Sequence, residues 1–558
     1  MDLGEKRMWQ IIKFVKQYAK IYKGSIALFI LLSVGTWCAN IAIPYITGNY
    51  IDTLVLVKTK DYVYSFALLV LVVNLINMVI SFFWDLLNTK LNSKVAYAIS
   101  HDLFKHLRFA QISEFENKDS VYLSNRIIND SNNITFFCLN NIVSVLTNLG
   151  TLLAAFVILF KVHTPIALGL LPLIPIYAIL YFIFRKSLFD TNRKFRETQD
   201  EYMGVVSEQF QNIYYIKINV LFHEIALQLR QAYEKLFKRL YKFYRLNYIF
   251  SNLGNSILII ANVVLALFGG LAVVNNTLSI GMFSVLNIYF NMIISALSFF
   301  LNFAANLQEA KTSYSRLQEL YNIHPEHNGK AQIENIDTIT INDLSFAYNK
   351  SRSFYNHSTI RFEKGNIYCL LGENGAGKST FINIMVGLYM GKYEGQICYD
   401  NIDIKELDLY HIRRKLISIS AQEPILLSNT IYENIVLGVD DVDTQEIEYW
   451  CRILNIDETI KKMPNGIHTR LSEKSANISG GEKQKFTHIR SFLKKSNVFI
   501  FDEPTSALDK KSTEVLKDIL TEQKKDKIII IITHDQELNS IADYIVTFND
   551  NGITYNKV

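Results

Sequence analysis

The sequence predicts an α-helical domain of six membrane-spanning helices followed by an α/β domain built around a phosphate-binding loop. Three observations support this fold class. The 558 residues exceed what one hydrophobic core normally organises. Long uncharged apolar stretches occur only before residue 310, whereas charged residues occur throughout the sequence after about residue 330. A glycine-rich motif lies in the second part, between a predicted strand and a predicted helix.

These observations also predict the domain limits. We expect the helical domain at residues 1–325, a linker at 326–336 and the α/β domain at 337–558. The net charge of +5 comes mainly from basic residues beside the apolar stretches, which favours anionic lipid headgroups over nucleic acid as the partner. The five cysteines are scattered without a CxxC pair, so neither a disulfide framework nor a zinc site is expected.

The helical domain has uncharged stretches long enough to cross a bilayer, which takes roughly 20 apolar residues. Four of them predict one span each, at residues 25–51, 62–84, 131–160 and 164–184. The fifth, residues 246–308, is too long for one span, and the turn-forming pair Asn275 and Asn276 divides it into two. The first stretch is too long for the apolar region of a signal peptide, so we expect a retained helix.

The distribution of Lys and Arg predicts the orientation of the spans. Six lie before Gly24, six at residues 85–130 and twelve at residues 185–245, against three in the connections on the opposite side. The N-terminus and the α/β domain are therefore expected in the cytoplasm, with helices that continue beyond the membrane. The spans contain no charged residue, which argues against a transporter driven by proton or sodium flow.

Asparagine recurs in the predicted spans. Hydrogen bonds between helices would explain this, and so would a polar cavity. Aromatic side chains in the same spans could line a cavity for an amphipathic molecule, or could face lipid or other helices. The asparagines are Asn74, Asn77, Asn140, Asn141, Asn148, Asn255, Asn262, Asn287 and Asn291.

The phosphate-binding loop is the most informative segment of the α/β domain. An apolar strand ends at Gly372 and a helix begins near Lys378, with the pattern GxxxxGKS between them. The glycines let backbone N–H groups face phosphates, Lys378 adds a positive charge there, and Ser379 can place its hydroxyl on Mg²⁺. The residues expected to bind the nucleotide here are Gly372, Glu373, Asn374, Gly375, Ala376, Gly377, Lys378, Ser379 and Thr380.

Two adjacent carboxylates follow a second apolar strand, at residues 498–501. We expect Asp502 to reach the Mg²⁺ shell and Glu503 to act as the general base that takes a proton from the attacking water. A solvated acidic pair at a strand end is the alternative interpretation. The phosphate-binding loop upstream favours the catalytic one.

A third motif narrows the class of protein. The segment ISGGEKQK, which begins at Ile478, resembles the signature motif of ABC ATPases. Further motifs of that family follow one another in the expected order: Tyr348, GENGAGKST, Gln422, ISGGE, FDEP, SALD and His534. The resemblance implies that the chain is an ATPase with ATP and Mg²⁺ as its cofactors.

The resemblance also implies roles for single residues. Tyr348 matches the aromatic residue that stacks on adenine. Gln422 matches the glutamine that joins the metal and water site to the transmembrane part. His534 matches the histidine that contacts the γ-phosphate and orients the attacking water.

The signature residues match a site that is shared between subunits. Ser479, Gly480 and Gly481 resemble the residues that close over the γ-phosphate bound to the opposite subunit, and Asp509 resembles the residue that links the two sites. Glu482 stands where the family more often has Gln, and we expect this departure to leave the chemistry untouched. A homodimer would have two competent sites.

The resemblance extends into the helical half. The segment at residues 108–134 resembles the first cytoplasmic loop of ABC exporters, with a coupling helix near residues 113–122. The segment at 212–224 resembles the second loop, which in that fold reaches the partner's ATPase domain. The order of the two halves favours an exporter, and the layout is typical of a multi-pass protein of the bacterial cytoplasmic membrane.

The cargo is left open by the sequence. A peptide or bacteriocin-like product comes first, a lipid or hydrophobic drug second, and siderophore uptake third. The chain starts almost at its first span, so we expect any peptide cargo to be processed elsewhere. A soluble ABC ATPase that acts on ribosomes or DNA would not need the six spans, and an ATP-gated channel would not need the full set of catalytic groups.

Overall fold

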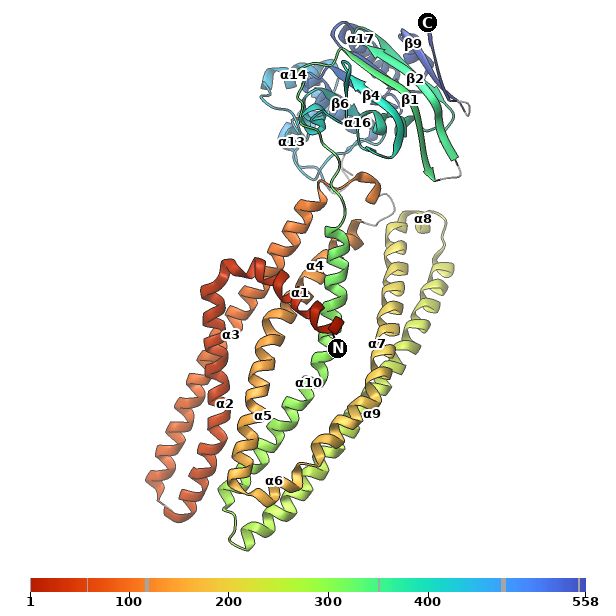
Figure 1. The fold of residues 1–558 in the computed structure, drawn as a ribbon. Helices are drawn as coiled ribbons and strands as arrows, with labels where there is room; N and C mark the ends of the chain where they lie inside the picture. Colours follow the sequence, from red (N-terminus) through yellow and green to blue (C-terminus); the bar gives the residue numbers. More distant parts are fainter. Residues whose placement is uncertain (1, 58, 116–119, 350–351, 473–477, 550–551) are drawn as a thin grey trace. The chain divides into compact units, whose positions relative to one another are not determined.

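The computed structural model describes the chain except residues 1, 58, 116–119, 350–351, 473–477 and 550–551. It divides into two compact units. Unit 1 comprises Met1–His106 and Ser120–Asn322, and unit 2 comprises Leu107–Asp119 and Ile323–Val558. Unit 1 is helical and unit 2 combines helices with two sheets (Figure 1), so the predicted fold class is confirmed.

Unit 1 consists of long helices. In chain order they are α1 (Asp2–Ala19), α2 (Lys23–Val57), α3 (Lys60–Leu107), α4 (Ser120–Phe136), α5 (Ile142–Val162), α6 (Thr164–Leu170), α7 (Leu173–Gln211), α8 (Ile213–Ile218), α9 (Phe222–Val274) and α10 (Ile280–Tyr321). Helices α3, α7 and α9 have 48, 39 and 53 residues. A bilayer needs roughly 20, so these helices continue well beyond their apolar spans.

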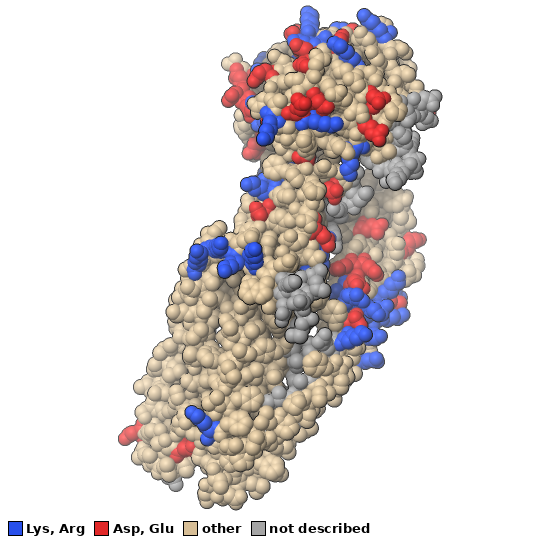
Figure 2. All heavy atoms as spheres, viewed as in Figure 1, with Lys and Arg blue, Asp and Glu red and all other residues tan. Residues whose placement is uncertain are grey.

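Within the described residues, five helical stretches are long and apolar enough to cross a membrane, and they cover five of the six predicted spans. The sixth, at 164–184, was expected as one helix but is divided between α6 and α7. The division falls at Leu171 and Pro172 because proline has no N–H for the helical ladder. Figure 2 shows the broad uncharged surface of these helices, as expected for a multi-pass membrane protein.

Helices α2 and α10 are in backbone contact. A Cβ atom on Gly281 would lie 1.9 Å from the carbonyl oxygen of Gly48, so only glycine fits at this crossing. Beside it, Asp52 accepts a hydrogen bond of 2.7 Å from the N–H of Gly281 and another from the hydroxyl of Ser279, the N-cap of α10. The start of α10 is therefore fixed to the end of α2.

Unit 2 contains two sheets. The strands are β1 (Thr338–Asn349), β2 (Arg352–Glu363), β3 (Ile367–Gly372), β4 (Tyr393–Tyr399), β5 (Ile402–Asp403), β6 (Ile417–Ser420), β7 (Val498–Asp502), β8 (Ile528–Ile532), β9 (Tyr544–Asn549) and β10 (Gly552–Lys557). The larger sheet has the order β10-β9-β3-β8-β7-β6, with parallel pairing from β9 to β6. The smaller sheet, β2-β1-β4-β5, is antiparallel.

The central strand β8 shows why the larger sheet is parallel and buried. Its five isoleucines are all buried, and they alternate between two hydrophobic cores. Ile530 packs with the smaller sheet, whereas Ile529 packs with the helices on the other face. A strand covered on both faces reads as a continuous apolar run, as it does here.

The start of the first predicted loop belongs to unit 2, whereas its part from Ser120 onward belongs to unit 1. The N–H of Glu326 donates to the carbonyl of Phe109 at 2.6 Å, and the ring of Phe109 lies edge-on to Tyr410 at 5.7 Å. Tyr410 belongs to α12 (Leu409–Lys415), which leads directly into β6. Part of the predicted coupling helix, residues 116–119, lies outside the described residues.

Candidate nucleotide-binding site

The carboxyl ends of four adjacent parallel strands form one edge of the larger sheet. β3, β8, β7 and β6 all point the same way, so the segments that follow them meet at this edge. These segments are the phosphate-binding loop, His534, the pair Asp502 and Glu503, and Gln422. Open α/β sheets bind their ligands at this edge.

The phosphate-binding loop connects β3 to α11 (Lys378–Met385). Gly375 and Gly377 have φ values of 84° and 95°, in the left-handed region that favours glycine. The buried Tyr355 donates a hydrogen bond of 2.7 Å to the carbonyl of Gly377 and so holds the loop from its core side. The Nζ of Lys378 donates to the carbonyl of Gly372 at 2.7 Å, inside the curve of the loop.

A cavity of about 370 Å³ lies at this sheet edge. It brings together ten of the predicted site residues and adds Ile532. Its lining is Asn374, Gly375, Gly377, Lys378, Ser379, Thr380, Gln422, Asp502, Glu503, Ile532 and His534. The other loop residues, Gly372, Glu373 and Ala376, belong to the same turn without lining the cavity. The side chain of Tyr348 lies outside the described residues.

The two carboxylates differ in their surroundings. Asp502 accepts a hydrogen bond of 2.9 Å from the hydroxyl of Ser379, while burial raises its pKa. Glu503 has a φ of 49° and lies 3.8 Å from Nε2 of His534. Burial raises the pKa of Glu503 as well, and the nearby His534 opposes that effect. A carboxylate with a raised pKa at the cavity wall suits a general base.

The cavity offers few metal ligands. The described residues contain no group of three or more His, Cys, Asp and Glu that could hold a metal. The hydroxyl of Ser379 and the carboxylate of Asp502 are the adjacent oxygens that could hold Mg²⁺ together. This fits an ion that keeps most of its sites for water and phosphate oxygens, as Mg²⁺ usually does.

The signature residues do not line this cavity. Ser479 is the N-cap of α16 (Gly480–Leu493), and Glu482 completes a capping box with it. A Cβ on Gly481 would lie 2.6 Å from the carbonyl oxygen of Ala507, so the close packing of α16 on the SALD segment requires glycine here. Asp509 caps α17 (Lys510–Gln523) through the N–H of Ser512. Hydrogen bonds from the side chain and then the backbone of Ser512 lower the pKa of the Asp509 carboxyl.

Glu482 contacts Ser479, one of the residues expected to close over the phosphate. Its carboxylate accepts hydrogen bonds from both the hydroxyl of Ser479, at 2.8 Å, and the N–H of Ser479, at 2.7 Å. The hydroxyl expected to meet a phosphate is therefore bound to a carboxylate of its own helix.

Gln484 is a site-supporting residue that the motif comparison missed. It is 1% exposed, and its Nε2 donates to the carbonyl of Glu503 at 2.9 Å while its Oε1 accepts from the N–H of Ala507 at 3.1 Å. The signature helix is thus joined directly to the segment that carries Glu503, the expected general base. The signal in the sequence was that a polar glutamine lies on the same face of the helix as the residues that are buried.

Family models match both halves of the chain. The model described as the ABC transporter transmembrane region matches residues 26–297, and the model described as ABC transporter matches residues 355–506.

Several bacterial proteins are similar to almost the whole chain. The Bacillus subtilis protein YgaD, provisionally named a multidrug export ATP-binding/permease protein, is 23% identical over 97% of this chain and 95% of its own. The Streptococcus pneumoniae transport/processing ATP-binding protein ComA is 24% identical over 95% of this chain and 74% of its own. A Staphylococcus aureus protein with the same provisional name as YgaD is 24% identical over 97% of this chain and 96% of its own.

A solved structure has the same fold. The structure of a bacterial Atm1-family ABC exporter with ATP bound has a TM-score of 0.80 at 17% identity, over 97% of this chain and 95% of that chain. This similarity and the two family matches agree with the observed order of a helical unit with long spans followed by an ATPase domain with these motifs. The chain belongs to the ABC transporter superfamily as an exporter-type half-transporter, in which ATP hydrolysis is coupled to transport.

Proposed function

We propose that two copies of this chain export an amphipathic substrate across the bacterial cytoplasmic membrane by alternating access. One observation supports the proposed homodimer. The cavity contains Lys378 and Glu503, whereas Ser479 of the same chain lies outside it. A second copy is needed to supply the signature residues to each site.

In this proposal the phosphates of ATP lie against the N–H groups of the loop and the N-terminus of α11. Ser379, Gln422 and Asp502 would hold Mg²⁺, which would offset the phosphate charge. Glu503 takes the proton of the attacking water, and His534 and Gln422 orient that water. Ser479 of the partner subunit closes the site.

The contacts of α12 support a route from the cavity to the helices. Gln422 follows β6, and α12 precedes that strand and packs on Phe109 through Tyr410. The hairpin of α7 and α9 ends in α8, where the tyrosines Tyr214 and Tyr215 are exposed. We propose that this tip docks on the ATPase domain of the partner.

A cavity between the spans supports the choice of an uncharged, hydrogen-bonding cargo. It measures about 510 Å³ between α2, α3, α5 and α10 and contains no charged residue. Trp37 and Trp84 supply apolar surface, and the amide oxygens of Asn148 and Asn291 accept no hydrogen bond from the described residues. The lining includes Ser33, Thr36, Asn40, Ser144, Thr147, Thr151 and Ser295.

Unpaired amide oxygens beside indole rings suit a peptide with neutral side chains, because such a cargo offers N–H donors and apolar groups together. We therefore favour a peptide or bacteriocin-like product. The name of ComA, which joins transport to processing, supports this choice because processing acts on a cargo with cleavable bonds. The names of YgaD and the Staphylococcus aureus relative support a hydrophobic drug as the second candidate.

The shared site can be tested with mixed dimers. Chains with Lys378→Ala and chains with Ser479→Ala should each be inactive alone, because every site then lacks one group. Mixed dimers should regain ATPase activity, since one of their two sites combines the intact loop of one chain with the intact signature of the other. No recovery in purified mixed dimers would reject the shared site.

The cargo can be tested in lipid vesicles. A panel of neutral peptides, lipids and drugs should contain a class that stimulates ATP turnover and accumulates in inside-out vesicles. Asn148→Ala combined with Asn291→Ala should raise the KM for that cargo, whereas Asn74→Ala, outside the cavity, should not. Equal effects of the two changes would reject this cavity as the cargo site.

A further inference from the structure

A second cleft in unit 1 has a different character from the cavity between the spans. It lies between α7 and α9 and measures about 380 Å³. Four cations, one carboxylate and two hydroxyls line it, so the lining has an excess of three positive charges. The lining residues are Ile183, Lys186, Ser187, Asp190, Thr191, Lys194, Arg239 and Lys242.

Among the described residues, the cations of this cleft form no ion pair within 4 Å with a carboxylate. Elsewhere on the same two helices, Arg193 pairs with Glu197 and Arg230 pairs with Glu234. In the described part of the chain, no such ion pair is formed by Lys186, Lys194, Arg239 or Lys242. Their charge is available to a ligand.

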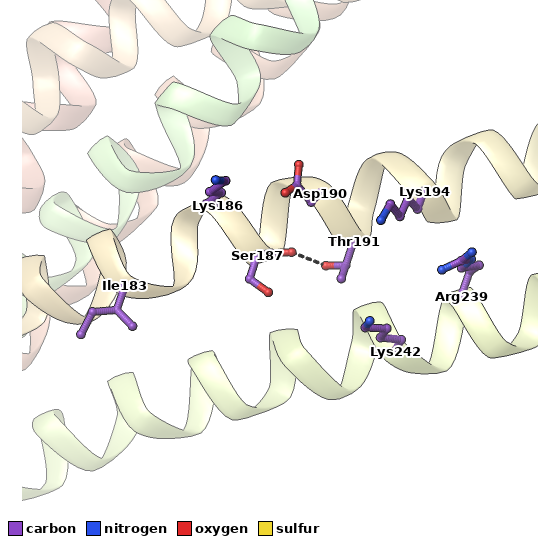
Figure 3. A pocket seen from close by; sticks show the side chains of 8 residues that line it. All are labelled: Ile183, Lys186, Ser187, Asp190, Thr191, Lys194, Arg239 and Lys242. Atoms are coloured by element: carbon purple, nitrogen blue, oxygen red, sulfur yellow. Dashed lines mark hydrogen bonds between the residues drawn. The ribbon is translucent and has the colours of Figure 1, made fainter.

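Figure 3 shows how these side chains lie. Arg239 and Lys242 rise from α9 toward α7, where Thr191 and Lys194 face them. Lys186 and Asp190 lie on the side of α7 away from α9 in this view. The hydroxyl of Thr191 already donates to the carbonyl of Ser187 at 2.7 Å, so the cations provide the main attraction.

The cleft lies where both helices leave their uncharged segments. Lys186 comes two residues after the segment 164–184, about 3 Å along the helix, and Lys242 comes four residues before the segment 246–308, about 6 Å along it. The headgroup layer of a bilayer is about 5 to 8 Å thick on each side. Lys194 and Arg239 lie further out, but their long side chains can reach back toward it.

Aromatic residues mark the same level independently. Tyr241, Tyr244 and Tyr248 follow one face of α9 and are exposed, and Tyr244 packs against Phe243 at 5.3 Å. Phe243 in turn stacks on Phe195 of α7 at 5.8 Å, which holds the two helices at a fixed spacing beside the cleft. Exposed tyrosines gather at the boundary between hydrocarbon and water in membrane proteins.

From these observations we infer that the cleft between α7 and α9 binds the phosphate of an anionic lipid headgroup in the cytoplasmic leaflet. Basic pockets between helices on that side of the membrane bind such headgroups. The guanidinium of Arg239 and the ammonium groups of Lys194 and Lys242 would contact the phosphate, with Lys186 adding positive charge at the rim of the cleft. The acyl chains would lie along the uncharged segments 164–184 and 246–308, on the hydrocarbon side of the phosphate.

The test measures lipid retention by native mass spectrometry of the full-length protein, purified in detergent and given phosphatidylglycerol or phosphatidylcholine. The variant is Arg239→Gln with Lys242→Gln, and the control is Lys235→Gln with Lys238→Gln, which removes the same charge from α9 outside the cleft. Each surface cation contributes about a fivefold gain in binding, so the variant should bind phosphatidylglycerol about 30-fold more weakly. The control should bind like the wild type.

Three outcomes would overturn the inference. Equal retention of phosphatidylglycerol by variant and control would exclude the cleft as its site. Displacement of the lipid by millimolar inorganic phosphate would indicate a site for soluble anions. A loss of dimer in the variant, with lipid retention unchanged, would indicate that a second copy of the chain covers the cleft.

Discussion

At the scale of single residues, the proposed mechanism depends most directly on Glu503. Glu503→Gln keeps the shape of the side chain but removes its ability to accept a proton. We expect ATP turnover to fall by roughly 10² to 10⁴, with ATP binding retained. Turnover near the wild-type rate, measured beside nucleotide binding in the same preparation, would reject Glu503 as the base.

The pH dependence of turnover should report on the same carboxylate. Burial raises the pKa of Glu503 above its ordinary value of 4.5, and the base must be deprotonated to work. Activity should therefore fall as the pH is lowered through a value above 4.5. His534 opposes the rise, so His534→Gln should move this acidic limb to still higher pH, and a limb that stays in place would contradict the pairing.

For Glu482 we expect a substitution to help ATP-driven association, whereas Glu503→Gln is expected to lower ATP turnover. The Glu482 carboxylate holds the hydroxyl of Ser479 and adds negative charge where the signature should meet a phosphate. Glu482→Gln would weaken the competing bond and remove the charge, so we expect lower ATP concentrations to drive association of the ATPase domains. Glu433→Gln, in the other described capping box with a Glu, is the matched control. An unchanged or higher ATP requirement would contradict this account.

At the scale of elements, Gln484 joins α16 to the loop after β7. Gln484→Leu would leave the carbonyl of Glu503 and the N–H of Ala507 without their buried partner. Each unmet buried group costs about 1 to 3 kcal/mol, so the free energy of unfolding of the ATPase domain should drop by at least that amount. Gln523→Leu, at the end of α17, should change it little in the same denaturant titration.

The elements differ in how far the sequence could predict them. The loop from Gly372 to Lys378 and the pair Asp502 and Glu503 could be named in advance because their chemistry depends on spacing within a few residues. The break at Pro172 could not be read from the proline alone, since Pro44 lies inside the continuous helix α2. The bonds of Gln484 could not be read from spacing either, since they join residues 19 and more positions apart through the fold.

The same distinction applies to the cavity between the spans and the helices that enclose it. Uncharged length alone located the helices. Asn148 and Asn291 came from a list of nine span asparagines with no means of choosing among them, because the choice depends on which faces of four helices meet. The partners of Phe109 were equally hidden, since its segment precedes α12 by 300 residues.

At the scale of the whole molecule, the charge distribution predicts which ends of the helices face the cytoplasm. In a variant whose five cysteines are replaced, Asn276→Cys should react with an impermeant thiol reagent added outside right-side-out vesicles. Lys235→Cys should react only after permeabilisation. Labelling of Lys235→Cys from outside would reverse the proposed orientation and, with it, the assignment of the α7 and α9 cleft to the cytoplasmic leaflet.

The close crossing of α2 and α10 has a mechanical consequence. With Gly48 and Gly281 in backbone contact and Asp52 bonded to the start of α10, neither helix can slide there without losing those contacts. The 42 residues of α10 extend about 63 Å from that point. A tilt of about 5° around a fixed end would displace the far end of the helix by about 5 Å. The crossing can therefore act as a pivot, so that a small rotation there produces a larger displacement at the other end of α10.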